Sequence, residues 1–305
     1  MPTRQGSFRL FQVAGIQVFL HWSWFIVAYY GIQARMGSYT SLLWPVLDYL
    51  ALFATVLLHE FGHAFATRSV GGRAEEIVLW PLGGVAFVQA PPRPGAQLWS
   101  IAAGPLVNLI LLPLFFVAAM VTESAGWEST NPNAQNFLMD MVYLNAGLLI
   151  FNLLPVYPLD GGQIFRSLLW FVFGRAKSLK IASVVGFVGV ALLAAYALKS
   201  GSILNMVMAG FVGMNCWRGW QEAKLLTRIE QWPRRAGFHC PSCEKAPPVG
   251  SFWRCGACGG SFDTFESFGA CPACGMAQAT TGCPECGNMH PMGQWVGDSG
   301  SPHRR

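Results

Sequence analysis

The chain has 305 residues, of which 53% are hydrophobic and only 11% are charged, and its formal net charge is +5. A soluble domain carries roughly 25% charged residues, so this composition excludes an ordinary soluble protein and predicts that lipid surrounds much of the chain. The basic residues are spread along the sequence and form no single patch, which argues against a nucleic-acid-binding surface.

Six apolar segments are long enough to cross a hydrocarbon core of about 30 Å at about 1.5 Å per residue. The fourth is interrupted by Pro155 and Pro158 and continues as an apolar stretch toward Phe173. We therefore expect an α-helical polytopic membrane protein of about six transmembrane helices, near residues 17–35, 45–67, 97–121, 138–157, 181–199 and 202–217.

Alternating apolar and polar residues predict a small β-structure among these spans. Residues 8–13 alternate and predict one strand. Residues 74–90 predict two short strands joined around residues 81–84, a hairpin near the site whose free edge could pair with an extended peptide. A loop lying on the membrane surface is the alternative for residues 74–90.

The second span carries the sequence HEFGH at residues 59–63. Residues i and i+4 of a helix share a face, so His59 and His63 can present two nitrogens to one metal ion, and Glu60 can reach a water bound there. Polar groups within an apolar segment are costly and usually functional. The pattern predicts a zinc site at membrane depth; a histidine pair that only hydrogen-bonds its neighbours is the alternative, and it leaves Glu60 unexplained.

Catalytic zinc takes three protein ligands, and Asp160 is the best candidate for the third. It lies near the cytosolic end of the fourth span, and the two glycines after it let the backbone approach closely. A turn residue before two glycines is the alternative for Asp160.

Four other residues in the spans receive structural interpretations. His21, between apolar residues and two tryptophans, is interpreted as an interface residue, with metal ligation as the alternative. Gly104 and Asn108 lie one helical turn apart, which favours helix packing with a polar cross-helix bond over a catalytic role. Cys216 is interpreted as a small buried apolar residue.

Positive charge is distributed unevenly between the two sides of the spans. Nine basic residues fall on the side of the N-terminus and two on the other side, and the positive-inside rule then places the N-terminus in the cytosol. Eight of the nine cysteines follow residue 239, and thiols stay reduced in the cytosol. We expect a multi-pass integral membrane protein with cytosolic N- and C-termini.

Three motifs together resemble the site-2 protease family of intramembrane zinc metalloproteases. They are HEFGH at residues 59–63, GPLVN at residues 104–108 and NLLPVYPLDGG at residues 152–162, and the resemblance covers about residues 8–175. It implies that His59, His63 and Asp160 hold a catalytic zinc ion. It further implies that Glu60 is the catalytic base and acid and that Asn152 positions the substrate or the oxyanion. The implied reaction is hydrolysis of peptide bonds in or near transmembrane segments of membrane proteins.

Four CxxC pairs occupy the C-terminal region, after an amphipathic helix predicted over residues 217–235. Each pair supplies two thiolates to a tetrahedral ion, which predicts a double zinc ribbon, with free redox dithiols as the alternative. Sequential and nested pairings use the same thiolates, so the sequence leaves the pairing open. The predicted ligands are Cys240, Cys243, Cys255, Cys258, Cys271, Cys274, Cys283 and Cys286.

These patterns divide the chain into an intramembrane metalloprotease domain (residues 1–222), a juxtamembrane amphipathic linker (223–239), a double zinc ribbon (240–287) and a disordered tail (288–305). The expected cofactors are one catalytic and two structural zinc ions. The expected partners are a transmembrane protein substrate, the lipid bilayer and a protein bound by the ribbons. Lys245 and Arg254 are the only basic residues from Cys240 to Cys286, which argues against nucleic acid.

Two alternatives to the enzyme stay open at this stage. One is a catalytically silent homologue that binds membrane proteins without cutting them. The other is a membrane anchor that acts through its zinc ribbons.

Overall fold

The computed structural model describes residues 6–80 and 83–296. The chain forms two compact units, which we call the helical unit, up to residue 223, and the ribbon unit, from residue 224.

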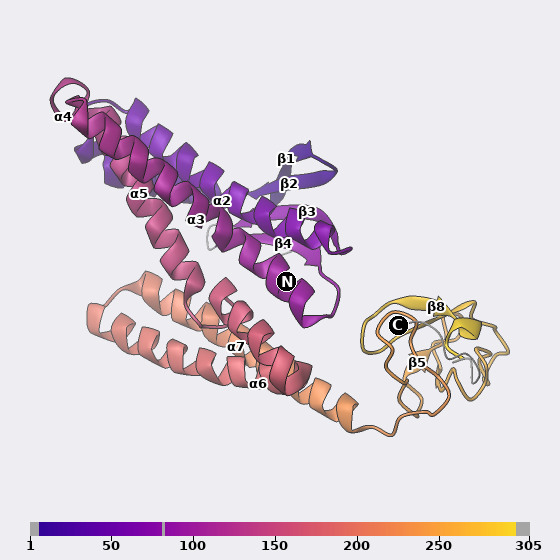
Figure 1. Cartoon of the computed structure of the whole chain (residues 1–305). Helices are drawn as coiled ribbons and strands as arrows, with labels where there is room; N and C mark the ends of the chain where they lie inside the picture. The colour runs from indigo at the N-terminus through magenta and orange to yellow at the C-terminus, as the bar shows by residue number, and fades with distance from the viewer. Residues whose placement is uncertain (1–5, 81–82, 297–305) are drawn as a thin grey trace. The chain divides into compact units, whose positions relative to one another are not determined.

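Long helices dominate the helical unit (Figure 1). Helices α2 and α3 pack along each other, and α5 packs against both. The elements are α1 (Trp24–Arg35), a short 3-10 turn η1 (Met36–Ser38), α2 (Leu43–Ser69), α3 (Pro94–Ser124), α4 (Trp127–Thr130), α5 (Pro132–Leu153), α6 (Asp160–Ser200) and α7 (Ile203–Gln231).

Among the described residues, α2, α3, α5 and α6 are the four helices long and apolar enough to cross a membrane. The expectation of six such helices is therefore not confirmed. The first predicted span, residues 17–35, contains a strand followed by the 12-residue α1, which at about 1.5 Å per residue covers only about 18 Å. The sixth, residues 202–217, is the start of α7, a 29-residue helix whose charged second half reflects the predicted amphipathic segment.

Helix α6 consists of two helices that fold back on each other at Gly174. The backbone of Gly174 is non-helical, with φ 78° and ψ 174°. Gly162 and Gly186 both lie against the backbone of Tyr157, although a straight helix would hold them about 36 Å apart. The stretch predicted to continue toward Phe173 is thus a separate helix, which begins at Asp160 and runs beside the fifth predicted span.

A four-stranded sheet with the order β1-β2-β3-β4 packs against α2. Its strands are β1 (Ser7–Val13), β2 (Ile16–His21), β3 (Arg73–Trp80) and β4 (Gly83–Gln89). The two hairpins are antiparallel, and β2 pairs with β3 in parallel. The structure confirms the predicted strand at residues 8–13 and the two paired strands predicted within residues 74–90, while residues 81–82 of the predicted turn lie outside the described residues. Within the described residues, β4 pairs only with β3 and so leaves one edge open.

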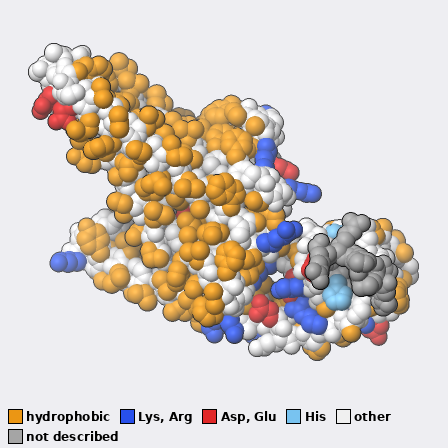
Figure 2. All heavy atoms as spheres, in the orientation of Figure 1, with side chains coloured by type: hydrophobic (Ala, Val, Ile, Leu, Met, Phe, Trp, Pro, Cys, Tyr) orange, Lys and Arg blue, Asp and Glu red, His pale blue; other side chains and the backbone are white. Residues whose placement is uncertain are grey.

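Apolar side chains fix the sheet to the helices. Ile16, Val18, Ile77 and Leu79 are fully buried and pack with Ala64 of α2. The helical unit also exposes many large hydrophobic side chains, and they cover its long helices on the face seen in the space-filling view (Figure 2). Such an exposed apolar surface requires lipid or protein around it.

The ribbon unit contains two short hairpins, β5 (Trp253–Arg254) with β6 (Ser261–Phe262) and β7 (Thr280–Gly282) with β8 (Met289–Pro291), followed by the 3-10 turn η2 (Met292–Gln294). Its core is small and aromatic, and the rings of Phe265 and Trp295 meet edge to face at 4.9 Å between centroids. The side chain of Trp295 is completely buried.

The prediction of a disordered tail from residue 288 is wrong for residues 288–296, and residues 297–305 lie outside the described residues. Strand β8 pairs with β7, and the backbone N–H of His239 donates to the carbonyl of Trp295 over 2.8 Å. Burial of Trp295 in the aromatic core explains why a glycine- and proline-rich sequence is ordered here.

Candidate metal centre

Helix α2 brings His59, Glu60 and His63 into the protein interior, where each residue is less than a tenth exposed. The i to i+4 spacing places both imidazoles on one face, with their Nε2 atoms 3.1 Å apart. Glu60 is buried beside His59 on the same turn. The apolar helix therefore concentrates three ionisable groups in one place.

Asp160, the first residue of α6, completes the group from the opposite side. Its Oδ2 lies 3.0 Å from Nε2 of His59 and 3.4 Å from Nε2 of His63. The two glycines after it are required by crowding: a Cβ on Gly161 would lie 2.2 Å from the carbonyl oxygen of Leu153. The structure thus unites three predicted ligands that are about a hundred residues apart in sequence.

A chain of amides fixes the protonation of His59. Asn145 donates through Nδ2 to the carbonyl of Met141, so its Oδ1 accepts from Nδ2 of Asn108. Oδ1 of Asn108 is then left to accept from Nδ1 of His59, over 2.6 Å. The proton of the neutral His59 ring must therefore be on Nδ1, and Nε2 presents a lone pair to Asp160.

The same reasoning fixes His63. Its Nδ1 donates to the backbone carbonyl of Ser100 over 2.9 Å, so its Nε2 is also unprotonated when the ring is neutral. Two imidazole lone pairs and a carboxylate oxygen then meet without a proton among them, an arrangement that repels itself unless a cation joins it. Two nitrogens and one carboxylate oxygen form a donor set that zinc takes in catalytic sites, so the residues fit a zinc ion.

Helix α3 approaches this group closely because of Gly104. A Cβ at Gly104 would lie 2.3 Å from Nε2 of His63 and 2.7 Å from Nε2 of His59. Any other residue would thus enter the space in front of the ligand atoms. The packing predicted for Gly104 and Asn108 is present, and the cross-helix bond of Asn108 goes to the ring of His59, a partner that the sequence interpretation did not identify. The signal in the sequence is a single amide within a strongly apolar segment; the structure shows that this amide is fully buried.

Two other residues considered from sequence lie elsewhere. Asn152 is half-buried in the last turn of α5, and its role stays a prediction. His21 ends β2, where its ring stacks on Trp80 at 4.0 Å between centroids and its Nδ1 hydrogen-bonds to Ser23. Its contacts fit the structural interpretation rather than the metal-ligand alternative.

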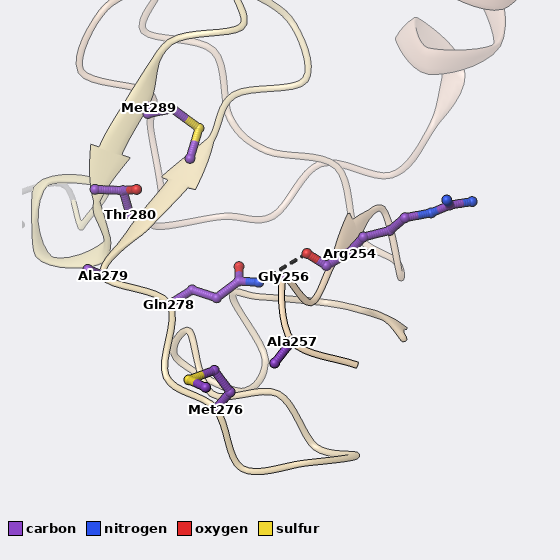
Figure 3. Close-up of a pocket in the computed structure, with 8 residues that line it drawn as sticks. All are labelled: Arg254, Gly256, Ala257, Met276, Gln278, Ala279, Thr280 and Met289. Carbon is purple, nitrogen blue, oxygen red and sulfur yellow. Dashed lines mark hydrogen bonds between the residues drawn. The ribbon is translucent and has the colours of Figure 1, made fainter. Parts of the chain in front are cut away.

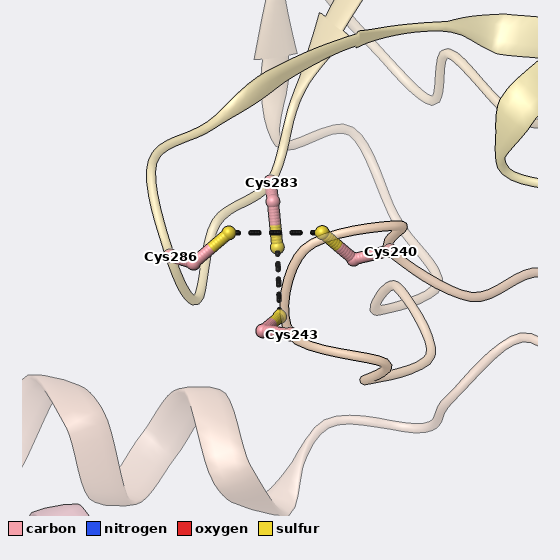
Figure 4. A group of neighbouring side chains, drawn as sticks. All are labelled: Cys240, Cys243, Cys283 and Cys286. Carbon is pink, nitrogen blue, oxygen red and sulfur yellow. Dashed lines mark hydrogen bonds between the residues drawn. The ribbon is translucent and has the colours of Figure 1, made fainter. Parts of the chain in front are cut away.

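The ribbon unit gathers its eight thiols into two groups of four. Cys240 and Cys243 meet Cys283 and Cys286, with sulfur–sulfur distances of 3.6 and 3.7 Å between the knuckles (Figure 4). Such distances are too long for disulfide bonds, which are about 2.05 Å long. They match the sulfur–sulfur edge of about 3.8 Å in a tetrahedral site with zinc–sulfur bonds of about 2.3 Å. The other group joins the two inner knuckles, Cys255, Cys258, Cys271 and Cys274. The pairing is therefore nested.

Charged side chains fasten the outer site to the end of α7. Arg234 forms an ion pair of 2.6 Å with Glu285, which lies between Cys283 and Cys286 in the sequence. The guanidinium of Arg234 also donates to the carbonyl of Ile229. Burial opposes ionisation of Glu285, but Arg234 and Lys245 nevertheless hold its pKa below the ordinary value.

A shallow groove lies on the ribbon between the inner knuckles and the β7–β8 hairpin (Figure 3). Its walls carry the side chains of Met276 and Met289, both about half exposed, and Gln278 donates to the carbonyl of Arg254 at its base. This surface is apolar with little charge.

Comparison with known proteins agrees with the geometry. The sequence profile of peptidase family M50 matches residues 48–130 and 121–196. A zinc metalloprotease of Methanocaldococcus jannaschii is 34% identical over 208 residues, which cover 68% of this chain and 58% of that protein. A putative zinc metalloprotease of Synechocystis is 31% identical over 217 residues, covering 67% of this chain and 55% of that protein. The chain thus matches little more than half the length of these two relatives.

A solved structure extends the likeness to the fold. The site-2 protease from Methanocaldococcus jannaschii superposes with a TM-score of 0.50 at 30% sequence identity, over 70% of this chain and 95% of that one. Together with the apolar helices, this match identifies an integral membrane protein with a site-2 protease fold. The chain belongs to peptidase family M50, the family of zinc metalloproteases that its histidine–aspartate group indicates.

Proposed function

We propose that this protein is an intramembrane zinc endopeptidase that hydrolyses peptide bonds in or near transmembrane segments of other membrane proteins. The observation that carries the proposal is the meeting of His59, His63 and Asp160 beside a buried Glu60. A closed structural site would need no acid next to its ligands, whereas hydrolysis needs one to move protons.

His59, His63 and Asp160 would hold the ion in this mechanism. A bound zinc ion supplies Lewis-acid polarisation of a carbonyl and lowers the pKa of its water to about 7. Asn108 and the carbonyl of Ser100 keep both imidazoles oriented with Nε2 toward the site. Glu60 takes a proton from the attacking water and returns it to the leaving amine. Asn152 helps to position the substrate.

A substrate helix hides its carbonyls in i to i−4 hydrogen bonds, so it must unwind before cleavage. The open edge of β4 offers main-chain partners for an unwound peptide, and the sheet packs on α2, the helix that carries both histidines. The substrate is therefore held as an added strand beside β4. The loop alternative for this segment is excluded, because residues 83–89 form a strand.

The protein crosses the membrane several times, with both termini in the cytosol. The distribution of basic residues and the reduced thiols of the ribbon unit support this orientation. The ribbon holds two structural zinc ions in closed four-thiolate sites, which leave no position for catalysis. It serves instead to bind a protein partner, for which the groove beside Met276 and Met289 is suited by its low charge.

The decisive experiment compares membrane-protein cleavage by the native protein and by Glu60→Gln. Positioned acid–base groups contribute about 10²–10⁴-fold to rate, so we expect product formation to fall by at least about 100-fold while zinc content is unchanged. Glu123→Gln, the same change at an exposed site on α3, serves as the control and should cleave normally. Identical product profiles for native protein and Glu60→Gln would exclude the enzyme and leave the silent homologue or the membrane anchor.

A further inference from the structure

The segment between α5 and α6, residues 154–159, leads directly into Asp160 and is contacted by small residues of the last helices. Because Asp160 follows it immediately, any displacement of this segment moves the carboxylate relative to the histidines. The helices that contact it lie mostly beyond the three motifs of the family resemblance. Their contacts with the segment therefore give them a role at the site.

The second half of α6 supplies one set of these contacts. A Cβ on Gly189 would lie 2.5 Å from Cγ2 of Val156, and a Cβ on Gly186 would lie 3.4 Å from the backbone nitrogen and oxygen of Tyr157. Gly186 and Gly189 are one helical turn apart and so face the segment together. A side chain at Gly189 would collide with Val156, and one at Gly186 would collide first with Sγ of Cys216, 2.6 Å from its Cβ, beside Tyr157.

Helix α7 lies against this half of α6 and contacts the segment through Cys216 and Gly219, again one turn apart. The thiol of Cys216 is fully buried and donates to the carbonyl oxygen of Tyr157 over 2.9 Å. A Cβ on Gly219 would lie 2.9 Å from Cε1 of the Tyr157 ring and 2.9 Å from Oγ of Ser183 on α6. Tyr157 is thus held at its backbone by one residue of α7 and at its ring by the other.

We propose that Cys216 and Gly219 of α7, with Gly186 and Gly189 of α6, are positioning residues for Asp160. They act through Tyr157 and Val156 and touch neither the ion nor the substrate. The inference rests on the proposed function, because it assumes that Asp160 is a ligand. Ligand atoms must be held to within about 0.5 Å, and residues that orient ligands typically change metal affinity by about 10–100-fold when replaced.

The test measures zinc affinity at the histidine site in the full chain, by chelator competition, and zinc stoichiometry by native mass spectrometry. Gly219→Leu places a side chain against the Tyr157 ring and should weaken zinc binding at this site by about 10-fold or more, with the two ribbon ions retained. Gly210→Leu is the matched control on the same helix, because nothing lies within 4 Å of a Cβ there. It should bind zinc as the native chain does.

A second pair of variants removes the hydrogen bond without adding bulk and serves if Gly219→Leu fails to fold. Cys216→Ser keeps a donor for the carbonyl of Tyr157 and should keep native zinc affinity. Cys216→Val has similar volume but no donor and should lose about 10-fold. Equal zinc affinity for the folded Cys216→Ser and Cys216→Val proteins would overturn the inference, as would native affinity in a folded Gly219→Leu. Loss of the histidine-site ion from the native chain itself would instead overturn the proposed function.

Discussion

His59 and His63 each hydrogen-bond to α3 through Nδ1 and point Nε2 into the site. This division is decided by two acceptors on α3, the amide oxygen of Asn108 and the carbonyl of Ser100. Both acceptors point a lone pair at a ring N–H, so the protein interior fixes the tautomers before any ligand binds. The pre-set tautomers make the site ready for a cation.

Replacing Asn108 tests this division at the scale of one residue. Leucine at position 108 is similar in volume to asparagine but cannot accept a hydrogen bond from Nδ1 of His59. The neutral ring of His59 can then carry its proton on Nε2 instead. We expect zinc affinity at the histidine site to fall by about 10–100-fold, as is typical for residues that orient ligands, measured by chelator competition. Asn215→Leu, on α7 with its amide bonded only locally, is the control. Unchanged affinity in a folded Asn108→Leu protein would contradict the tautomer argument.

The meeting of His59, His63 and Asp160 was predictable because such side chains are conspicuous in an apolar context, whereas their hydrogen-bond partners were not. A histidine pair at i and i+4 has a defined face, and an aspartate before two glycines marks a close approach. Asn108 was visible only as a small-residue packing motif, since its bond to His59 depends on how α2 and α3 are placed. Contacts through a backbone carbonyl, such as that of Ser100, leave no trace in the sequence.

At the scale of elements, short strands and helix reversals limited the predictions from sequence. Residues 16–21 are apolar enough to join the first predicted span, but they pair with β1 and β3 as β2. The sequence placed separate apolar segments on either side of residue 174, but it did not show that a single glycine, Gly174, with a positive φ makes the reversal. Long amphipathic or apolar helices, by contrast, were recognised from hydropathy alone.

The open edge of β4 predicts an alternating response to proline. In a strand, successive backbone N–H groups point to opposite edges. Proline substitutions made one at a time at residues 85–88 should therefore alternate in effect: one removes a hydrogen bond to β3, and the next removes a donor on the open edge. We expect substitutions on the open edge to reduce cleavage at least about 10-fold with normal thermal stability, whereas those facing β3 lower stability. Cleavage assays and melting of purified variants measure the two effects. Full activity for all four proline variants would remove the added-strand proposal.

The nested arrangement of the knuckles predicts which paired cysteine losses cost one ion and which cost two. Cys240→Ala with Cys286→Ala damages a single site, so one zinc should be lost; Cys240→Ala with Cys258→Ala damages both, so two should be lost. Native mass spectrometry of the full chain counts the ions. A sequential pairing would give the reverse result.

At the scale of the molecule, an apolar helical unit and a cysteine-rich unit are joined within one continuous helix. Composition predicted both kinds of unit, because lipid-facing helices and thiolate sites each have a distinct residue usage. It failed for residues 288–296, where a single aromatic residue, Trp295, orders a sequence that otherwise reads as disordered. The number of membrane crossings depends on how α6 folds back, which hydropathy does not report.

The proposed orientation is testable with a membrane-impermeant maleimide on intact cells. A cysteine introduced at Ser129, between α3 and α5, should react from outside, whereas one introduced at Arg93, before α3, should react only after lysis. Both positions are exposed in the fold, so reactivity reports the side of the membrane. Labelling of the cysteine introduced at Arg93 in intact cells would contradict the proposed orientation and indicate the opposite one.

Anomalous X-ray scattering at the zinc edge, on crystals of the whole 305-residue chain, tests the central claim most directly. The account predicts three peaks: two within the thiolate groups of the ribbon, and a third at about 2.0–2.2 Å from Nε2 of His59, Nε2 of His63 and a carboxylate oxygen of Asp160. Peaks confined to the eight cysteines of a zinc-saturated sample would contradict it.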